Sequence, residues 1–254
     1  MHRLRHLRNQ VPGRRAQCHP DHQRGGEPPS TQRHRQRRLR LKTTLISCLT
    51  LVLLASASLA LGDLLIDDFE NGIDSGWAIK EFAGHSEYRP VRDGAEQVLS
   101  CRSDGTASSL YFRKKIDLGK TPVLTWRWKI ESTLEKGDAS RREGDDYAAR
   151  VYVVFPHWLF FKTRAINYIW ANRLAQGAVV PNPFTANAMM LAVQSGNSKA
   201  GQWVEERRNV FEDFKQIFGE EPPLVGGVAI MCDSDNTGSS AQSWYDDIRF
   251  LQGD

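Results

Sequence analysis

Two adjacent carboxylates, Asp145 and Asp146, open a predicted strand that ends at Phe155. Successive side chains on a strand point to opposite faces, so these two carboxylates cannot both serve one site by simple strand geometry. Asp146 shares a face with Arg150, and a strand facing them could add Arg127. Such a surface could bind a polar ligand, or it could supply one half of a glycosidase-like carboxylate pair. The alternative is a solvated sheet face with cross-strand ion pairs.

An aromatic run, Pro156–Phe161, follows the same strand and contains Trp158. One interpretation is an exposed loop in which Trp158 contacts a ligand or a membrane surface. We favour a buried cap at one end of the fold, because core packing is the commoner use of tryptophan. The sequence contains no nucleophile elbow, phosphate loop, dinucleotide fingerprint or zinc-ligand spacing. Because these motifs are absent, sequence motifs do not assign a reaction to this chain.

Carboxylates also gather near both ends of the predicted domain. If its first and last strands lie side by side, Asp68 and Glu70 of the first approach Asp247 of the last. Carboxylates brought together repel one another unless a cation lies among them, and Ca²⁺ accepts six to eight oxygen ligands. One interpretation is a structural Ca²⁺ at these three residues, and the sequence requires no other cofactor. The alternative is that each carboxylate pairs with a nearby Lys or Arg, or extends into solvent.

Beyond residue 60 the sequence contains two cysteines, Cys101 and Cys232. Cys101 has the phase of Leu99, and Cys232 has the phase of Ile230, so both thiols are expected to point into the core. A disulfide between an early and a late strand is one interpretation, given an oxidising compartment. Two buried free thiols are the other.

The elements that position these residues follow a hydrophobic period of two. In Val123–Ile130 the apolar side chains, including Trp126 and Trp128, share one face, which we assign to the core. The same reasoning predicts the following strands: Ser108–Ile116, Val123–Ile130, Asp146–Phe155, Ala188–Gln194, Gly227–Cys232 and Ser243–Leu251.

Helical patterns are few. Asn209 can cap a helix whose apolar stripe contains Phe214, and Gly219 can end it. Phe160–Leu174 is ambiguous, and we interpret it as a short helix that crosses one end of the fold. Many strands, one or two short helices and no alternation of strand and helix predict a mainly β chain. We expect an antiparallel jelly-roll β-sandwich.

Charge divides the chain into a leader and a body. Residues 1–42 contain 12 of the 34 basic and 2 of the 30 acidic residues, and none of the aromatic ones. This basic segment is expected to be disordered. The body carries a net charge of −6, which argues against nucleic acid as a partner.

Residues 43–60 have the apolar core and the small exit residues of a signal peptide, with cleavage expected after Ala57 or Ala60. The alternative is an uncleaved anchor, which would be the chain's one contact with a membrane. We assign residues 61–254 to a single β-sandwich domain located in the periplasm or secreted.

Five ordered blocks of sequence form a recognisable set. They are Thr125–Trp128, Gly144–Val153, Glu206–Phe214, Phe218–Pro222 and Asp233–Gly238. Together they resemble the bacterial family called domain of unknown function 3047, over roughly Phe69–Leu251. The resemblance implies an exported single-domain protein without an assigned activity, and it transfers no catalytic residue.

A second resemblance concerns the two ends of the domain. Asp67–Gly72 with Trp77, and Trp244–Ile248, are similar to the first and last strands of galactose-binding-type jelly rolls. Those domains include many carbohydrate-binding modules. Our first hypothesis is therefore a non-catalytic domain that binds a glycan or another envelope component. The alternatives are an enzyme that acts on polysaccharide through carboxylates such as Asp146, and a structural subunit of an envelope assembly.

Overall fold

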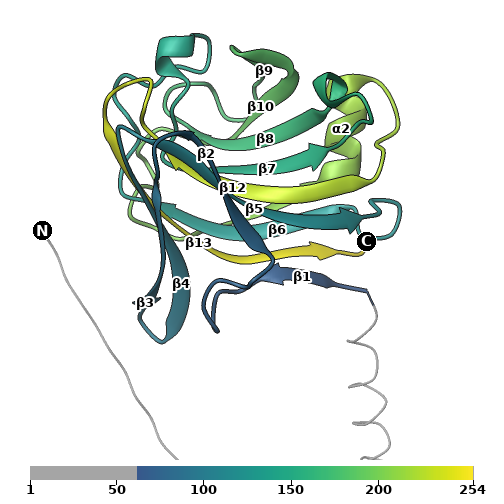
Figure 1. The fold of residues 1–254 in the computed structure, drawn as a ribbon, viewed down its shortest axis with the longest axis horizontal. Coiled ribbons are helices and arrows are strands. Elements are labelled where there is room, and N and C mark those ends of the chain that lie inside the picture. The colour runs from purple at the N-terminus through teal and green to yellow at the C-terminus, as the bar shows by residue number, and fades with distance from the viewer. Residues whose placement is uncertain (1–61, 254) are drawn as a thin grey trace, which may run out of the picture. The chain divides into compact units, whose positions relative to one another are not determined.

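The computed structural model describes residues 62–253, which form two stacked β-sheets (Figure 1). The predicted leader and signal segments lie outside these residues. The strands of sheet A are, in spatial order, β11 (Val204–Asn209), β6 (Val123–Ile130), β13 (Ser240–Leu251), β4 (Glu96–Asp104) and β3 (Glu87–Asp93), with β1 (Leu64–Asp67) also paired to β13. The strands of sheet B are β2 (Trp77–Ala83), β5 (Ala107–Ile116), β12 (Val225–Asp233), β7 (Arg150–Phe155), β8 (Arg164–Ala171), β10 (Thr185–Ser195) and β9 (Val179–Asn182).

This arrangement confirms the predicted mainly β sandwich of jelly-roll type. One pair of strands departs from the antiparallel expectation, because β10 runs parallel to β8. The chain leaves β8, passes to the sheet edge as β9, and returns as β10 between them. That insertion gives β10 the direction of β8.

Aromatic side chains join the two sheets. Trp126 and Trp128 of β6 are fully buried and lie edge to face, with ring centroids 5.4 Å apart. Across the core, Trp126 lies 5.4 Å from Tyr168, and Trp128 lies 5.6 Å from Trp170. The alternation in β6 therefore predicted the core face correctly.

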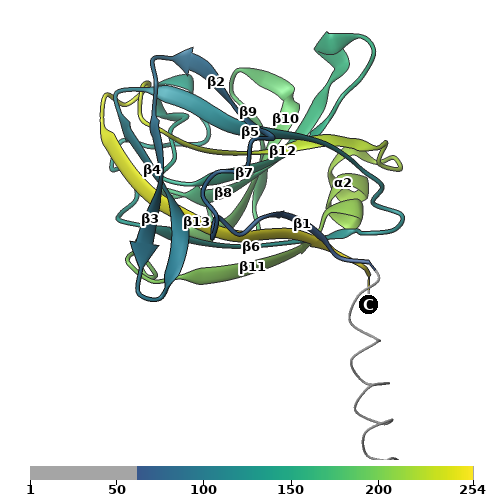
Figure 2. The same ribbon diagram turned by 60° about the horizontal axis from the view of Figure 1, so that its bottom comes forward.

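The helix forms where the sequence predicts it. α2 (Val210–Phe218) begins after Asn209, whose side-chain oxygen accepts a hydrogen bond from the Glu212 amide at 3.1 Å. It ends at Gly219, whose φ of 73° favours glycine. The helix lies at one end of the sandwich (Figure 2). Its Phe214 ring packs 4.5 Å from that of Phe155 in β7.

Two segments differ from their predictions. Phe160–Leu174 is mostly a strand, since a single 3-10 turn, η2 (Phe160–Lys162), leads directly into β8. The last six residues of β8 are all buried, because both faces of this strand are covered, and such a continuous buried run does not show the alternation that identifies a strand in the sequence. The predicted strand Asp146–Phe155 begins only at Arg150. No helix in residues 62–253 is long and apolar enough to span a membrane.

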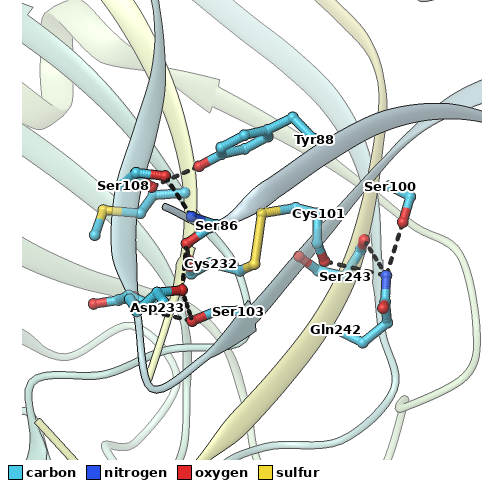
Figure 3. Close-up of a disulfide and its surroundings, with 12 residues drawn as sticks. Ser86, Tyr88, Ser100, Cys101, Ser103, Ser108, Cys232, Asp233, Gln242 and Ser243 are labelled. Atoms are coloured by element: carbon cyan, nitrogen blue, oxygen red, sulfur yellow. Dashed lines mark hydrogen bonds between the residues drawn. A yellow bond between two sulfur atoms is a disulfide. The ribbon is translucent and has the colours of Figure 1, made fainter. Parts of the chain in front are cut away.

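A disulfide connects the sheets. It joins Cys101 of β4 to Cys232 of β12, whose Cα atoms lie 6.2 Å apart (Figure 3). Both backbone carbonyls are engaged, since Ser86 Oγ donates to Cys232 O at 3.3 Å and Gln242 Nε2 donates to Cys101 O at 3.1 Å. The bridge therefore fixes the end of β12 immediately before Asp233.

Candidate functional site: a pocket on the outer face of sheet B

A pocket of about 430 Å³ lies on the outer face of sheet B. Its position follows from strand alternation: Val151 and Val153 of β7 enter the core, so Arg150 and Tyr152 point outward. Asn167 pairs with Tyr152 in the adjacent strand β8 and lines the same pocket. Hairpins and loops at this end of the sheet supply the remaining walls.

A buried guanidinium, that of Arg150, organises the pocket floor. Its Nε donates to Asp233 Oδ1 at 2.8 Å, and its Nη2 forms an ion pair with Asp233 Oδ2. Asp145 lies on another side, with its Oδ2 3.8 Å from Arg150 Nη1. Asn182 Nδ2 also donates to that Asp145 oxygen, at 2.7 Å. The guanidinium is thus held in place mainly by Asp233.

Three acidic side chains gather beside Arg150. Among the described residues, Asp146, Asp233 and Asp235 offer carboxylate oxygens that all lie within 4.8 Å of one another. Asp146 is fully buried and does not line the pocket. Its Oδ1 accepts from the amide and the side chain of Asn236 at 3.3 and 3.1 Å, and its Oδ2 accepts from the Thr237 amide at 2.6 Å.

Asp146, predicted as a ligand-binding residue, thus lies outside the lining of the pocket, and both of its oxygens hold the 236–237 loop in place. Arg150 does line the pocket, where its nearest charged partner is Asp233, and its role in binding stays a prediction. Asp146 precedes β7 rather than belonging to it, so the strand phase used to align it with Arg150 does not apply.

Two buried oxygens in the pocket wall have no hydrogen-bond donor among the described residues. They are Oδ1 of Asp145 and Oδ1 of Asn167, whose side chains are almost completely buried. A buried polar atom without a partner is costly, so such atoms commonly mark sites that a ligand completes. Both oxygens lie beneath the pocket surface, because neither has accessible area, and the Tyr147 hydroxyl lies beside Asp145.

Burial and charge together shift the protonation equilibria of the pocket. The pKa of Asp235 is raised, first by burial and then by the charge of Asp146. Burial by itself lowers the pKa of Arg150, but Tyr152, Asp145 and other neighbours raise it by more, so the guanidinium stays charged. Burial, followed by the charge of Asp145, raises the pKa of the Tyr147 hydroxyl.

Exposed aromatic rings line the rim of the pocket. Phe82 at the end of β2 is 59% exposed, and Phe184 between β9 and β10 is 52% exposed. Each ring already has a cation near one face: Lys80 Nζ lies 5.0 Å from the Phe82 centroid, and the Arg142 guanidinium lies 5.2 Å from that of Phe184. The rim thus combines apolar surface with positive charge above an acidic floor.

Arg127 was predicted to share a site with Arg150, and this prediction is wrong. β6 belongs to sheet A, so the two arginines lie on different sheets. Arg127 Nη2 pairs with Glu96 at 2.8 Å and with Asp246, and its Nε lies 2.9 Å from Asp247 Oδ2. Arg127 thus takes part in cross-strand ion pairs on a sheet face, which was the alternative to a ligand-binding surface.

The carboxyl group of Asp246 provides a pH-dependent prediction. Burial, together with the charge of Asp247, raises its pKa to about 6 from 3.8 in spite of Arg127. The folded state therefore holds this proton more tightly than the unfolded state, and the associated stability is lost as pH rises from 3.8 through about 6. We expect the wild type to lose unfolding free energy relative to Asp246→Asn as the pH rises over that interval. Urea unfolding of both proteins at several pH values measures it, and a constant difference would contradict the assignment.

Trp158 is 85% exposed, so the favoured buried cap is wrong and the exposed-loop interpretation describes its position. Phe160 in the same loop is equally exposed. The period of two could not predict the exposure of Pro156–Phe161, because this run lies in the connection between β7 and β8 and not in a strand. Trp158 does not line the sheet B pocket, so it is not brought together with Arg150.

The terminal carboxylates do lie on neighbouring strands, since β1 pairs with β13. Asp247, however, adopts a φ of 51° at an irregularity of β13 and pairs with Arg127 and Arg249. Asp68 Oδ1 accepts from the Glu70 amide at 3.3 Å, and Glu70 Oε1 accepts from the Gln97 amide at 3.1 Å. Among the described residues these three carboxylates do not form a metal-sized cluster, so the terminal Ca²⁺ site stays a prediction.

Most of the pocket residues were not selected from the sequence. Tyr152 could have been found, because it has the strand phase of Arg150. Asp233 and Asp235 could be recognised only as an oxygen-rich loop, and Asp145 only as the neighbour of Asp146. Asp233 and Asp235 come close to Arg150 because β12 pairs with β7, which places Met231 opposite Arg150.

Comparison with known proteins assigns a family to this pocket-bearing domain. Residues 75–249 match the family described as Protein of unknown function (DUF3047). The chain belongs to the DUF3047 family. This result confirms the resemblance seen in the sequence. Among curated proteins, none matches this DUF3047 chain.

Several solved β-sandwich structures are similar to the DUF3047 chain at low identity. The family 11 carbohydrate-binding module of the cellulase Lic26A-Cel5E of Clostridium thermocellum is 11% identical, with a TM-score of 0.41 over 76% of this chain and 96% of that one. The cleaved adhesin domain K1 of Lys-gingipain from Porphyromonas gingivalis W83 is 14% identical, with a TM-score of 0.39 over 76% and 99%. A Cel12A cellulase derived from that of Rhodothermus marinus is 9% identical, with a TM-score of 0.38 over 69% and 100%. At these values the similarity carries no argument about ligand or activity.

Proposed function

We propose that this DUF3047 domain binds a glycan or another cell-envelope component, without catalysis, in the pocket on sheet B. One observation carries the proposal: an exposed aromatic rim surrounds a floor of buried hydrogen-bonding groups. Binding pockets typically combine apolar walls with a few fixed polar groups, and a volume of about 430 Å³ lies within their usual range.

The chemistry of a sugar fits this combination. Its apolar C–H face can pack on the rings of Phe82 and Phe184, which are partly exposed. Its hydroxyl groups can exchange hydrogen bonds with polar side chains that line the pocket, among them Asn182 and Asp235. A fully apolar ligand would cover these polar groups without pairing them, which is unfavourable.

A second candidate function, hydrolysis of a polysaccharide, is favoured by one observation. The pKa of Asp235 is raised by burial and by the charge of Asp146, as it is in general acids of glycosidases. Asp146 is not available as the second carboxylate of such a pair, because its oxygens accept hydrogen bonds from Asn236 and Thr237. Turnover of labelled polysaccharide that Asp235→Asn abolishes would favour the enzyme over the binding domain.

We also propose that the domain acts in the periplasm or outside the cell. The segment 43–60 supports this proposal because it has the pattern of a signal peptide. The disulfide between Cys101 and Cys232 supports it as well, because disulfides persist in oxidising compartments. A third role, as a structural subunit of an envelope assembly, requires no ligand in the pocket.

Removing a rim aromatic is expected to weaken glycan binding while the fold is maintained. Phe184→Ala removes apolar ring surface that the sugar would bury, which at about 25 cal/mol per Å² is on the order of 1–2 kcal/mol and corresponds to roughly 5- to 30-fold in Kd. A glycan array with the domain 61–254 selects the ligand, and calorimetry of wild type, Phe184→Ala and Phe82→Ala measures the loss. Leu65→Ala is the matched control, because Leu65 is 50% exposed on sheet A. Unchanged binding in both Phe variants would contradict the assigned pocket.

A further inference from the structure

The connection between β7 and β8, residues 156–163, is an aromatic loop whose rings the core does not use. Trp158 and Phe160 are each 85% exposed, and Phe161 is 58% exposed, with its ring 5.8 Å from that of Phe160. Burial of rings of this size is strongly favourable, so three rings left in water forgo a large stabilisation. None of them lines the pocket on sheet B. Such an exposed apolar patch typically marks a surface that another body covers.

Hydrogen bonds fix the backbone of the aromatic loop. The His157 amide donates to Thr163 Oγ1 at 3.3 Å, which joins the two ends of the loop. The Thr163 amide donates to Phe160 O at 3.0 Å, and the side chain of Asn187 in β10 donates to Phe161 O. The rings are therefore held outward by an ordered turn. Pairing of these backbone groups within the protein also lowers the cost of moving the loop into an apolar medium.

The aromatic loop lies at the end of the sandwich at which the chain enters the domain. Gly226 of β12 packs against the start of the loop, since a Cβ at that position would lie 2.6 Å from Pro156 Cγ. The preceding residue, Val225, pairs with Ile116 at the end of β5, and Ile116 lines a surface pocket together with Gly62. α2, the start of β1 and the C-terminus lie at this same end (Figures 1 and 2).

We propose that the aromatic loop inserts its rings into the surface of a lipid bilayer, which holds this end of the domain on a membrane. The inference goes beyond the proposed glycan binding and does not depend on it. Trp, Phe and Leu are the residues with which interfacial segments bury apolar surface at the boundary between headgroups and acyl chains. Lys162, which is exposed directly after Phe161, can keep its charge at the level of the headgroups.

Two observations favour a bilayer over a protein as the occupant. The apolar segment 43–60 is separated from Gly62 by one residue, so as a signal peptide or as an anchor it connects this end of the domain to a membrane. The aromatic loop is also short, with four consecutive apolar residues in Trp158–Phe161. A stable protein interface covers roughly 800 Å² and about 20–30 residues on each partner, whereas a bilayer requires no complementary surface.

The test is sedimentation of the domain 61–254 with vesicles of phosphatidylcholine, whose headgroup has no net charge. This domain contains both sheets and the whole described core, so its fold does not depend on the segment 43–60. Because the domain carries a net charge of −6, burial of the rings and not charge attraction must supply the affinity. Wild type is therefore expected to bind these vesicles and to stay bound at high salt.

Variants of exposed residues connect this binding to the aromatic loop. The double variant with Trp158→Ala and Phe160→Ala should partition into vesicles at least about 10-fold less than wild type. Ile79→Ala is the matched control and should bind as wild type does. Ile79 is an exposed apolar residue on β2, an edge strand that β5 and β12 separate from β7. Circular dichroism checks that each variant is folded.

Trp158→Phe distinguishes insertion from adsorption. It keeps an apolar ring and should keep most of the binding, but quenching of tryptophan fluorescence by brominated acyl chains should fall relative to wild type. Failure of wild type to bind vesicles, or equal binding by the double alanine variant, would overturn the inference and leave the glycan-binding pocket unaffected. Self-association of wild type in analytical ultracentrifugation, lost in the double variant and without vesicle binding, would assign the rings to a contact between copies and likewise overturn it.

Discussion

Removing the disulfide, with Cys101→Ser and Cys232→Ser in one protein, is expected to lower the free energy of unfolding by about 3–5 kcal/mol. The two cysteines are 131 residues apart and connect β4 of sheet A with β12 of sheet B. Closing so long a loop restricts the unfolded chain strongly, so its release stabilises the unfolded state. Guanidinium unfolding of the two proteins measures the difference.

Thiol titration provides the control for this comparison. The domain 61–254, unfolded without reductant, should show no free thiol, because Cys101 and Cys232 are its only cysteines. Two free thiols would contradict the bridge. A second readout is ligand binding, since Asp233 directly follows Cys232 and holds Arg150. The double variant should therefore bind its ligand more weakly under conditions in which it is still folded.

Truncating Trp126 to alanine is expected to destabilise the domain by about 3–5 kcal/mol, as large aromatic deletions in cores do. Trp126 is fully buried and contacts Trp128 within its strand and Tyr168 across the core. Its loss opens a cavity between the sheets that rigid strands cannot close. Urea unfolding monitored by circular dichroism measures the change without relying on tryptophan fluorescence.

Trp158→Ala is the matched control for that measurement, because the same residue type is 85% exposed there. Its cost should stay within about 0.5 kcal/mol, as for most surface substitutions. Arg127, the neighbour of Trp126, is a poor control although its side chain points outward. It pairs with Asp246, which is buried, and its removal would leave that carboxylate without its cation. Equal costs for the two tryptophans would contradict the strand assignment.

Local sequence determined much of the fold. The alternation in Val123–Ile130 placed Trp126 and Trp128 in the core, because a strand's period of two is a property of the backbone itself. Asn209 and Gly219 delimited α2 for a similar reason, since capping depends on the residue at the helix end. The sequence blocks that resemble DUF3047 also identified the family from the chain alone.

The tertiary structure decided which strands are neighbours, and with them the site. Alternation tells which way Arg127 and Arg150 point from their strands, but it contains no information on the sheet to which each strand belongs. The pocket required β12 to pair with β7, so that Asp233 reaches Arg150 from 83 positions along the chain. Asp146 and Trp158 lie outside the regular strands, where the period of two no longer applies. Their burial and exposure are set by contacts between distant segments, which a local pattern does not encode.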